Sequence, residues 1–498
     1  MSSVDRHGGR PETRVDVRAG TWSALVAEAR PRTQEAVVGT ADRWSRADLA
    51  DRVNGVGAWL TGLALPSGRP VPALVADTGP ALALVIAGAA TGRPIAPLGA
   101  RLTVTELAEI ARGLASGVLL AEAGLVPLAA EVAWAAGSQL VVLPDPLPPG
   151  GPRLPAPEAD DVAMVLHTSG TTGAPKAIAL RQRALAARVR AYRSVVPLGP
   201  GDRFVTAAGF HHIAGLGNLA VAVAAGATVV SFPAFSVDAW RALAPLGVTH
   251  ALLVPTMIEM LLAADALALP ALRWMQYGAA PIHPDTLRAA LAALPGVRLA
   301  NLFGQTEGSP LCVLTGEDHH AAVAGQPELL SSVGRAAPGV ALRIESADTD
   351  GVGELCACGD HVFAADADGW LRTGDLARID ADGYVHLAGR TGDTINRGGE
   401  NVRPVEVETL LRSHPAVSDA AVAGVPDRRL GEEVAAWVVP VDTNSPPSEE
   451  ELTGYLRARL AGFKVPRRWA FVESLPRGAA GKLLRRALAD MAAPTSQG

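Results

Sequence analysis

The feature that most constrains the fold is a repeated alternation of short apolar runs with stretches of helical spacing, which extends to about residue 345. Residues 46–64 have helical spacing, and residues 71–77 form a short apolar run. Residues 79–98 have the pattern of a helix, a glycine turn and a strand. Parallel strands need such helical crossovers to connect them, so the alternation predicts an α/β domain with mostly parallel strands.

Residues 143–161 interrupt this pattern with seven prolines. We expect an extended surface loop rather than a domain boundary, because the apolar run at 162–166 resumes the pattern at once. Farther along, residues 370–390 carry short strand patterns around an Asp-Gly pair at 382–383. That pair between alternating apolar residues predicts an antiparallel hairpin.

The C-terminal stretch has a different organisation. Residues 405–417 and 449–461 have helical spacing, and the two apolar runs between them predict strands. We therefore expect a large N-terminal α/β domain of several subdomains over residues 1–389, and a small α+β domain over residues 390–498.

Composition excludes several classes of protein. The chain has 498 residues, 49% of them hydrophobic and 19% charged, with a net charge of −6. This balance predicts a globular protein and argues against nucleic acid as the main partner. The three cysteines, Cys312, Cys356 and Cys358, indicate reduced thiols in the cytoplasm and no zinc site. We expect no signal peptide, because residues 1–14 are polar and contain no apolar stretch. We also expect no membrane span, because the most apolar window, residues 213–230, fits a buried helix and a strand better.

Lysine is rare in this chain. Only Lys176, Lys464 and Lys482 occur among the 44 Lys and Arg residues. Because this chain uses arginine for most of its positive charges, its few lysines are candidates for positions where a compact ammonium is needed.

The strongest chemical motif is HTSGTTGAPKAI, residues 167–178, which follows the apolar run VAMVL. Successive Ser, Thr and Gly residues form a loop whose backbone N–H groups and hydroxyls can bind phosphates, and Lys176 adds a positive charge. The motif is not a Walker A loop, because Gly-Lys-Ser/Thr is absent at the required spacing.

This motif resembles the AMP-binding signature of the adenylate-forming superfamily, which includes acyl- and aryl-CoA synthetases, adenylation domains of peptide synthetases, and luciferases. Further segments resemble motifs of that superfamily in the same order, covering nearly the whole chain. They are FHHIAGLGN (210–218), YGAAPI (277–282), NLFGQTEG (301–308), GWLRTGDLA (369–377), residues 382–408 and LPRGAAGKLLRRAL (475–488).

The resemblance implies the superfamily's fold, with a mobile C-terminal domain, and a set of nucleotide-binding residues. Phe303 would stack on adenine, Asp375 would accept both ribose hydroxyls, and Arg390 would contact the ribose. The implied nucleotide-binding residues are Thr168, Ser169, Gly170, Thr171, Thr172, Gly173, Lys176, Gly278, Ala279, Ala280, Asn301, Phe303, Gly304, Asp375 and Arg390.

The resemblance also implies the catalytic groups. Lys482 would be the catalytic lysine, Thr306 would bind a phosphate, and Glu307 would hold Mg²⁺. His212 would act in the acyl pocket, for which the implied lining residues are His212, Gly215, Gly217, Ala279 and Gly304.

Other positions bear on the second half-reaction. Gly398, Gly399 and Glu400 would lie near CoA, and Gly392 would be the hinge, where relatives often have Asp or Lys. Rotation of the small domain would move the catalytic lysine out of the site and open the route by which the thiol enters.

Together these features predict an AMP-forming acid–CoA ligase that uses ATP, Mg²⁺ and CoA. The pocket segment FHHIAGLGN has no acidic residue to bind an amine, so we expect a neutral bulky acyl, aryl or alicyclic carboxylic acid. The alternative is an enzyme that passes acyl-AMP to a separate acyl-accepting protein. The sequence leaves the acid, the thiol acceptor and a homodimer open.

Overall fold

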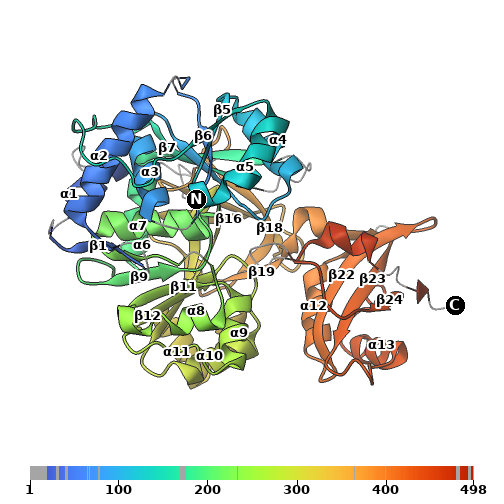
Figure 1. The fold of residues 1–498 in the computed structure, drawn as a ribbon. Helices are drawn as coiled ribbons and strands as arrows, with labels where there is room; N and C mark the ends of the chain where they lie inside the picture. The colour runs from blue at the N-terminus through green and yellow to red at the C-terminus, as the bar shows by residue number, and fades with distance from the viewer. Residues whose placement is uncertain are drawn as a thin grey trace, which may run out of the picture.

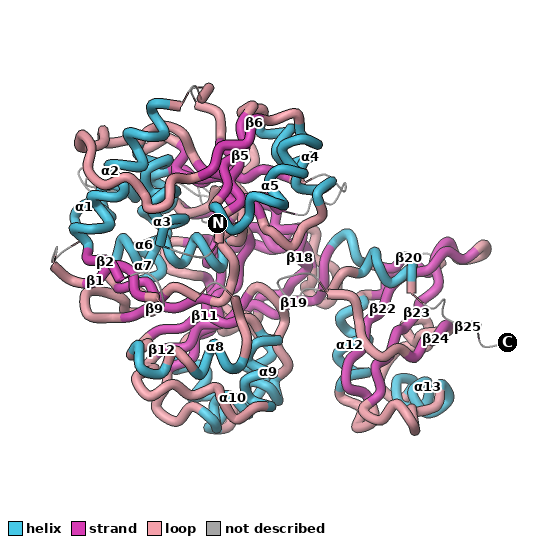
Figure 2. Tube along the Cα trace, in the orientation of Figure 1, coloured by secondary structure: helices cyan, strands magenta, loops and turns pink. Residues whose placement is uncertain are grey.

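The computed structural model describes residues 20–29, 33–39, 43–63, 65–66, 68–76, 79–168, 175–232, 234–363, 365–398, 400–477, 483–491 and 495–496. The chain forms a large N-terminal lobe that contains three sheets and a small C-terminal lobe that contains one (Figure 1). Helices and strands alternate through the large lobe, whereas strands dominate the small one (Figure 2).

The largest sheet has nine strands, and its central neighbours are parallel. Antiparallel pairs occur at both of its edges. In spatial order its strands are β15 (Arg335–Ala336), β14 (Gly308–Leu314), β13 (Arg298–Gln305), β12 (Trp274–Gly278), β11 (His250–Leu253), β9 (Arg203–Thr206), β10 (Thr228–Val230), β1 (Glu35–Val38) and β2 (Arg43–Ser45).

A second sheet of six strands is parallel except for its last pair. Its order is β6 (Gln139–Val142), β5 (Val118–Ala121), β3 (Val71–Leu74), β4 (Ile95–Leu98), β7 (Val162–Thr168) and β8 (Lys176–Arg181). The expected α/β class with mostly parallel strands is therefore confirmed for both large sheets.

Helices surround and separate these sheets. Helix α3 is buried at ten of its twelve residues, as expected for a helix that is apolar on every side, and its core joins residues of both large sheets. The helices of this lobe are α1 (Trp22–Glu28), α2 (Arg46–Gly62), α3 (Gly79–Ala90), α4 (Val104–Leu114), η2 (Ala123–Leu125), α5 (Val126–Ala136), α6 (Gln182–Arg193), η3 (Ile213–Gly217), α7 (Asn218–Ala225), α8 (Val237–Arg241), η4 (Ala244–Leu246), α9 (Pro255–Ala263), α10 (Pro284–Ala293), α11 (Gly316–Ala324) and η5 (Pro327–Ser331).

The third sheet of the large lobe lies toward the small lobe (Figure 1). Its four antiparallel strands are β16 (Val340–Glu345), β17 (Gly353–Gly359), β18 (Leu371–Ile379) and β19 (Val385–Arg390). The Asp-Gly pair predicted to form a hairpin turn does connect β18 to β19, and Gly383 adopts the positive φ of 84° that favours glycine there.

The small lobe is built on a six-stranded sheet whose side chains alternate between two cores. On β23, Val434, Ala436 and Val438 face one core, which α12 and α13 cover, whereas Ala435 and Trp437 face the other. The elements are η6 (Thr391–Asp393), β20 (Ile395–Arg397), β21 (Glu400–Val402), α12 (Pro404–Arg412), β22 (Val417–Asp427), β23 (Gly431–Pro440), α13 (Glu449–Arg457), β24 (Arg468–Phe471), η7 (Arg485–Asp490) and β25 (Thr495–Ser496).

Two helices of the small lobe end earlier than predicted. Helix α12 ends at Arg412 rather than residue 417, because Pro415 disfavours a helical conformation at the residue before it and β22 begins at Val417. Helix α13 ends at Arg457 rather than residue 461 and gives way to turns.

The apolar window at 213–230 contains η3, α7 and β10, as predicted. Throughout the part of the chain that the structure describes, each helix is too short or too polar to cross a membrane. The two lobes touch through α12, which packs on β19, and through an ion pair between Arg403 and Asp348.

Candidate active site

The predicted phosphate loop connects two paired strands. β7 ends at Thr168, which lies opposite Lys176 at the start of the antiparallel strand β8. Lys176 is exposed at that point. The loop between them, including Ser169, Gly170, Thr171, Thr172 and Gly173, lies outside the described residues, so its role as a phosphate site stays a prediction.

His167 is a candidate that the motif analysis missed. Burial lowers the pKa of its imidazole to about 4, so the ring is neutral at pH 7. Its Nδ1 is buried and has no hydrogen-bond partner among the described atoms. A buried polar atom without a partner calls for an explanation, and a bound ligand is one. The sequence feature that could have identified His167 is its position next to the Ser/Thr/Gly loop.

The pocket segment places two histidines side by side at the start of the π-helix η3. The ring centroids of His211 and His212 are 3.9 Å apart. Burial lowers the pKa of both rings, and that of His211 falls to about 3 with further contributions from His212 and Arg101. Nε2 of His212 is buried without a partner among the described atoms. The predicted acyl-pocket histidine is therefore neutral, and one of its ring nitrogens is left without a partner by the part of the chain that the structure describes.

Gly99 makes room for the first of these rings. A Cβ atom at Gly99 would lie 2.6 Å from Cδ2 of His211, well inside van der Waals contact. The turn after β4 therefore depends on glycine for a close approach to the pocket segment.

The glycines of the pocket segment serve close packing. A Cβ at Gly215 would lie 2.1 Å from the carbonyl oxygen of Gly209, and one at Gly217 would lie 2.6 Å from Cδ1 of Ile213. Their predicted role in lining the acyl pocket stays a prediction.

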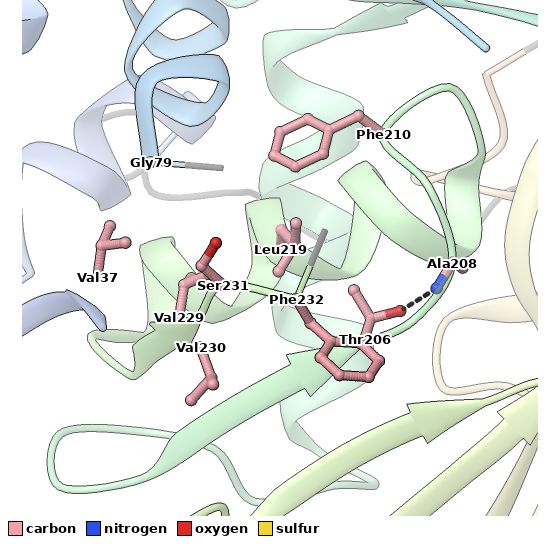
Figure 3. Close-up of a pocket in the computed structure, with 10 residues that line it drawn as sticks. All are labelled: Val37, Gly79, Thr206, Ala208, Phe210, Leu219, Val229, Val230, Ser231 and Phe232. Carbon is pink, nitrogen blue, oxygen red and sulfur yellow. Dashed lines mark hydrogen bonds between the residues drawn. The ribbon is translucent and has the colours of Figure 1, made fainter. Parts of the chain in front are cut away.

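A small cavity lies beside the pocket segment, below Phe210 (Figure 3). Its volume is about 10 Å³, close to the space that one water molecule needs. The lining residues come from β1, α3, β9, α7 and β10 and their flanks, and they are Val37, Gly79, Thr206, Ala208, Phe210, Leu219, Val229, Val230, Ser231 and Phe232. None of the predicted acyl-pocket residues lines it, and an acid could enter here only if side chains moved.

The predicted adenine segment follows β12. A Cβ at Gly278, the last residue of this strand, would lie 2.7 Å from the carbonyl oxygen of Leu302 on β13. Ala279 then adopts a positive φ of 67°, which is uncommon for a residue with a side chain. Ala280 is partly exposed, and Asn301 is buried on β13. The close approach at Gly278 and the turn at Ala279 fix the backbone at the position where the resemblance places the adenine base.

The β13–β14 hairpin carries Phe303, Gly304, Thr306 and Glu307, and all four are partly exposed. A Cβ at Gly304 would lie 2.7 Å from the carbonyl oxygen of Gly308, so the hairpin is too tight for a larger residue.

Two contacts fix this hairpin from outside. The amide of Phe363 donates to the Glu307 carbonyl at 2.6 Å, and Nε2 of Gln305 donates to the Thr373 carbonyl at 3.2 Å. Among the described residues no group of three or more His, Cys, Asp or Glu side chains could hold a metal ion. Mg²⁺ usually binds through one or two carboxylates together with substrate phosphates, so Glu307 on an open turn fits such an ion.

The two predicted ribose contacts lie together. Asp375 on β18 is opposite Arg390 on β19, and Nε of Arg390 is 3.0 Å from Oδ1 of Asp375. Nη2 of Arg390 also donates to the Thr373 carbonyl at 3.0 Å. The Asp375 amide donates to Oγ1 of Thr373 at 3.0 Å, so both ends of this residue are held.

The hinge and CoA positions begin the small lobe. Gly392 lies in η6, and a Cβ there would meet nothing within 4 Å, so the structure does not require glycine at this position. Gly398 has a positive φ of 62° and donates its amide to Leu430. Glu400 is exposed, and Gly399 lies outside the described residues.

The predicted catalytic lysine, Lys482, also lies outside the described residues. Arg485, three residues later, is described and forms ion pairs with Glu408 and with Asp393 beside the hinge. Although burial favours its neutral form, these carboxylates raise the pKa of Arg485. Lys464 binds both carboxylate oxygens of Glu406 at 2.8 Å, which gives it a structural role.

Comparisons with known proteins agree with this arrangement. The family model of AMP-binding enzymes matches residues 24–365, and that of the AMP-binding enzyme C-terminal domain matches residues 406–482. The chain is 33% identical to a fatty acid–[acyl-carrier-protein] ligase, ScoC of Streptomyces coeruleorubidus, covering 81% of this chain and 82% of the relative. It is 34% identical to a feruloyl-CoA synthase of Amycolatopsis sp., covering 79% and 83%. The solved structure of the amide bond synthetase McbA from Marinactinospora thermotolerans superposes with a TM-score of 0.84 at 31% identity, covering 95% and 99%.

Proposed function

This chain belongs to the family of AMP-binding enzymes in the adenylate-forming superfamily, and from that premise we propose that it is an AMP-forming acid–CoA ligase. One observation supports the proposal most. The carbonyl oxygen of Thr373 accepts hydrogen bonds both from Gln305, on the hairpin with the predicted adenine and Mg²⁺ residues, and from Arg390 of the predicted ribose pair. The first of these bonds joins residues 68 positions apart, and the two together connect the hairpin and the ribose pair in one candidate nucleotide site.

The first half-reaction joins two anions. The carboxylate oxygen of the acid attacks the α-phosphorus of ATP, the bond from that phosphorus to the bridging oxygen breaks, and pyrophosphate leaves. Repulsion between the anions is the main obstacle, and positioning with electrostatic stabilisation lowers it. Lys482 bridges the acid and the α-phosphate, whereas the loop at 168–173 and Lys176 bind the leaving pyrophosphate. Mg²⁺, held by Glu307 and the phosphates, would offset phosphate charge.

The second half-reaction needs the lobes to move. We place the domain boundary after residue 389, so that the small domain of residues 390–498 turns about Gly392. This rotation withdraws Lys482 and brings Gly398, Gly399 and Glu400 toward CoA, whose thiol displaces AMP from the acyl-adenylate.

The acid itself is a neutral bulky acyl, aryl or alicyclic carboxylic acid. In support, His211 and His212 are both held neutral by burial, and Phe210 and Phe232 are the largest side chains beside the neighbouring cavity. The reduced cysteines that the composition predicts are compatible with a cytoplasmic location.

A second function is transfer of acyl-AMP to an acceptor other than CoA. It is favoured by the similarity to ScoC, which is described as a ligase to an acyl carrier protein, and to McbA, described as an amide bond synthetase. In this alternative the first half-reaction and all nucleotide contacts are the same.

The test is acid-dependent exchange of labelled pyrophosphate into ATP across a panel of carboxylic acids, followed by product analysis with CoA, an acyl carrier protein or an amine. We expect AMP and pyrophosphate as products and an acyl-CoA thioester. Thioester only on the carrier protein, or amide only with the amine, would favour the second function. ADP and phosphate as products would refute adenylation.

A further inference from the structure

Arg188 is a buried positive charge in the middle of α6. It is 2% exposed, and burial lowers the pKa of its guanidinium to about 10, which leaves it protonated at neutral pH. Among the described residues no carboxylate forms an ion pair with it. Buried charges are normally paired, because removing an ion from water is costly.

The guanidinium instead binds neutral oxygen atoms on two segments of the candidate site. Nε donates to the Ser309 carbonyl at 2.8 Å, Nη1 donates to the Gly217 carbonyl, and Nη2 donates to Oδ1 of Asn218 at 2.9 Å. Ser309 is on β14, two residues after Glu307, whereas Gly217 ends the π-helix η3 that follows His212.

Arg188 binds at the end of a π-helix. Its wider turn changes the backbone pairing, and short π-helices occur frequently at functional sites. Asn218 accepts from Arg188 and donates through Nδ2 to the Ala214 carbonyl at 2.9 Å, so the arginine acts on two carbonyls of η3. A Cβ at Gly217 would lie 2.6 Å from Cδ1 of Ile213 but 3.4 Å from Cζ of Arg188, so the guanidinium packs at van der Waals distance from this turn.

The two segments differ in how much they depend on Arg188. The β13–β14 hairpin has other fixed contacts, through Phe363 to Glu307 and through Gln305 to Thr373. At the end of η3, by contrast, Arg188 binds the Gly217 carbonyl directly and orients Asn218. Loss of the guanidinium should therefore disturb the acid side of the site more than the nucleotide side.

We propose that Arg188 is a positioning residue that holds the pocket segment, residues 210–218, against the β13–β14 hairpin and thereby sets the affinity for the carboxylic acid. The proposal rests on the proposed function and adds a residue that acts through the backbone of η3. A methionine could fill the same volume without the cost of a buried charge, so this function gives a reason for the arginine.

The test compares Arg188→Gln and Arg188→Lys with Arg190→Gln, a control on the exposed face of the same helix. In pyrophosphate exchange we expect Arg188→Gln to raise the KM for the acid about 10-fold or more, with the KM for ATP within about twofold. Arg188→Lys should give an intermediate acid KM, because an ammonium keeps the charge but cannot hold three separated acceptors. The control should match the wild type.

Hydrogen exchange of the backbone amides supplies a measurement that does not depend on turnover. We expect exchange in residues 210–218 to be at least about tenfold faster in Arg188→Gln than in the wild type and in Arg190→Gln. An unchanged acid KM, an equal rise in both KM values, or unchanged exchange in residues 210–218 would overturn the proposal. If the wild type shows no acid-dependent reaction, the proposed function fails, and the amide exchange alone decides whether Arg188 holds the segment.

Discussion

Replacing Asp375 by alanine should separate nucleotide use from stability. In the structure Arg390 binds this carboxylate, and the backbone amide of Asp375 donates to Oγ1 of Thr373. The carboxylate would therefore meet the ribose hydroxyls without reorganising. Because the ion pair is partly exposed, with 38% of the arginine side chain accessible, its loss should change the free energy of unfolding by about 1 kcal/mol or less.

The effect on ATP should be much larger. A hydrogen bond to a charged group contributes about 1.5–3 kcal/mol, and the proposed role includes two of them. Because Arg390 already engages one carboxylate oxygen, we take the lower end for both bonds, about 3 kcal/mol in total. That energy corresponds to a decrease of roughly 10²-fold in kcat/KM for ATP. Asp375→Asn keeps the shape and one acceptor and should fall between alanine and the wild type.

The assay is pyrophosphate exchange with ATP as the varied substrate, together with urea unfolding of each variant. Asp368→Asn is the matched control, because this carboxylate lies on the loop before β18 and forms a more exposed ion pair with Arg343. The reasoning is refuted if Asp375→Ala retains kcat/KM for ATP within about twofold of the wild type, or if the control loses as much.

Three further outcomes are expected. Lys482→Ala should lower acid-dependent pyrophosphate exchange by about 10²–10³-fold while leaving thioester formation from supplied acyl-AMP largely intact, and exchange at the wild-type rate would show that the lysine is misassigned. Gly215→Ala should lower the free energy of unfolding in urea by about 3 kcal/mol, because its Cβ would overlap the Gly209 carbonyl, and a change below about 0.5 kcal/mol would contradict this packing. The neutral His211 ring contributes stability that is fully present above about pH 6.5 and is lost as the pH falls toward 3. His211→Gln should therefore flatten the pH dependence of the free energy of unfolding between about pH 6.5 and 4.5, by up to about 1.4 kcal/mol per pH unit. An unchanged slope would mean that the ring is protonated in the folded protein.

The fold was accessible from the sequence because its signals are local. The apolar runs at β3 and β7, the helical spacing of α2 and the Asp-Gly turn before β19 each appear within a few residues. Helix ends were less accessible, and α12 shows why: its helical spacing continues to Val417, but Pro415 disfavours a helical conformation at the residue before it.

The residues of the candidate site also differ in how far the sequence alone can single them out. Asp375 and Arg390 could be singled out because each lies in a recognisable motif, and their pairing follows from the hairpin register, whereas their contact with the ribose stays a prediction. Arg188 could not be found, because nothing local distinguishes it from the other arginines of α6, and its role exists only through Gly217 and Ser309, which are distant in sequence. The Nδ1 atom of His167, which has no hydrogen-bond partner among the described residues, likewise becomes apparent only in the packed structure.

The salt bridge between Lys464 and Glu406 has a practical consequence for experiments in solution. Of the three primary amines that side chains contribute to this protein, one is held by both oxygens of a carboxylate on the small lobe. An amine-selective reagent would therefore have two other side-chain targets, Lys176 and Lys482, and both belong to the proposed ATP-binding machinery. Protection of these two residues from modification by ATP or acyl-AMP could be followed residue by residue without introducing any label by mutation.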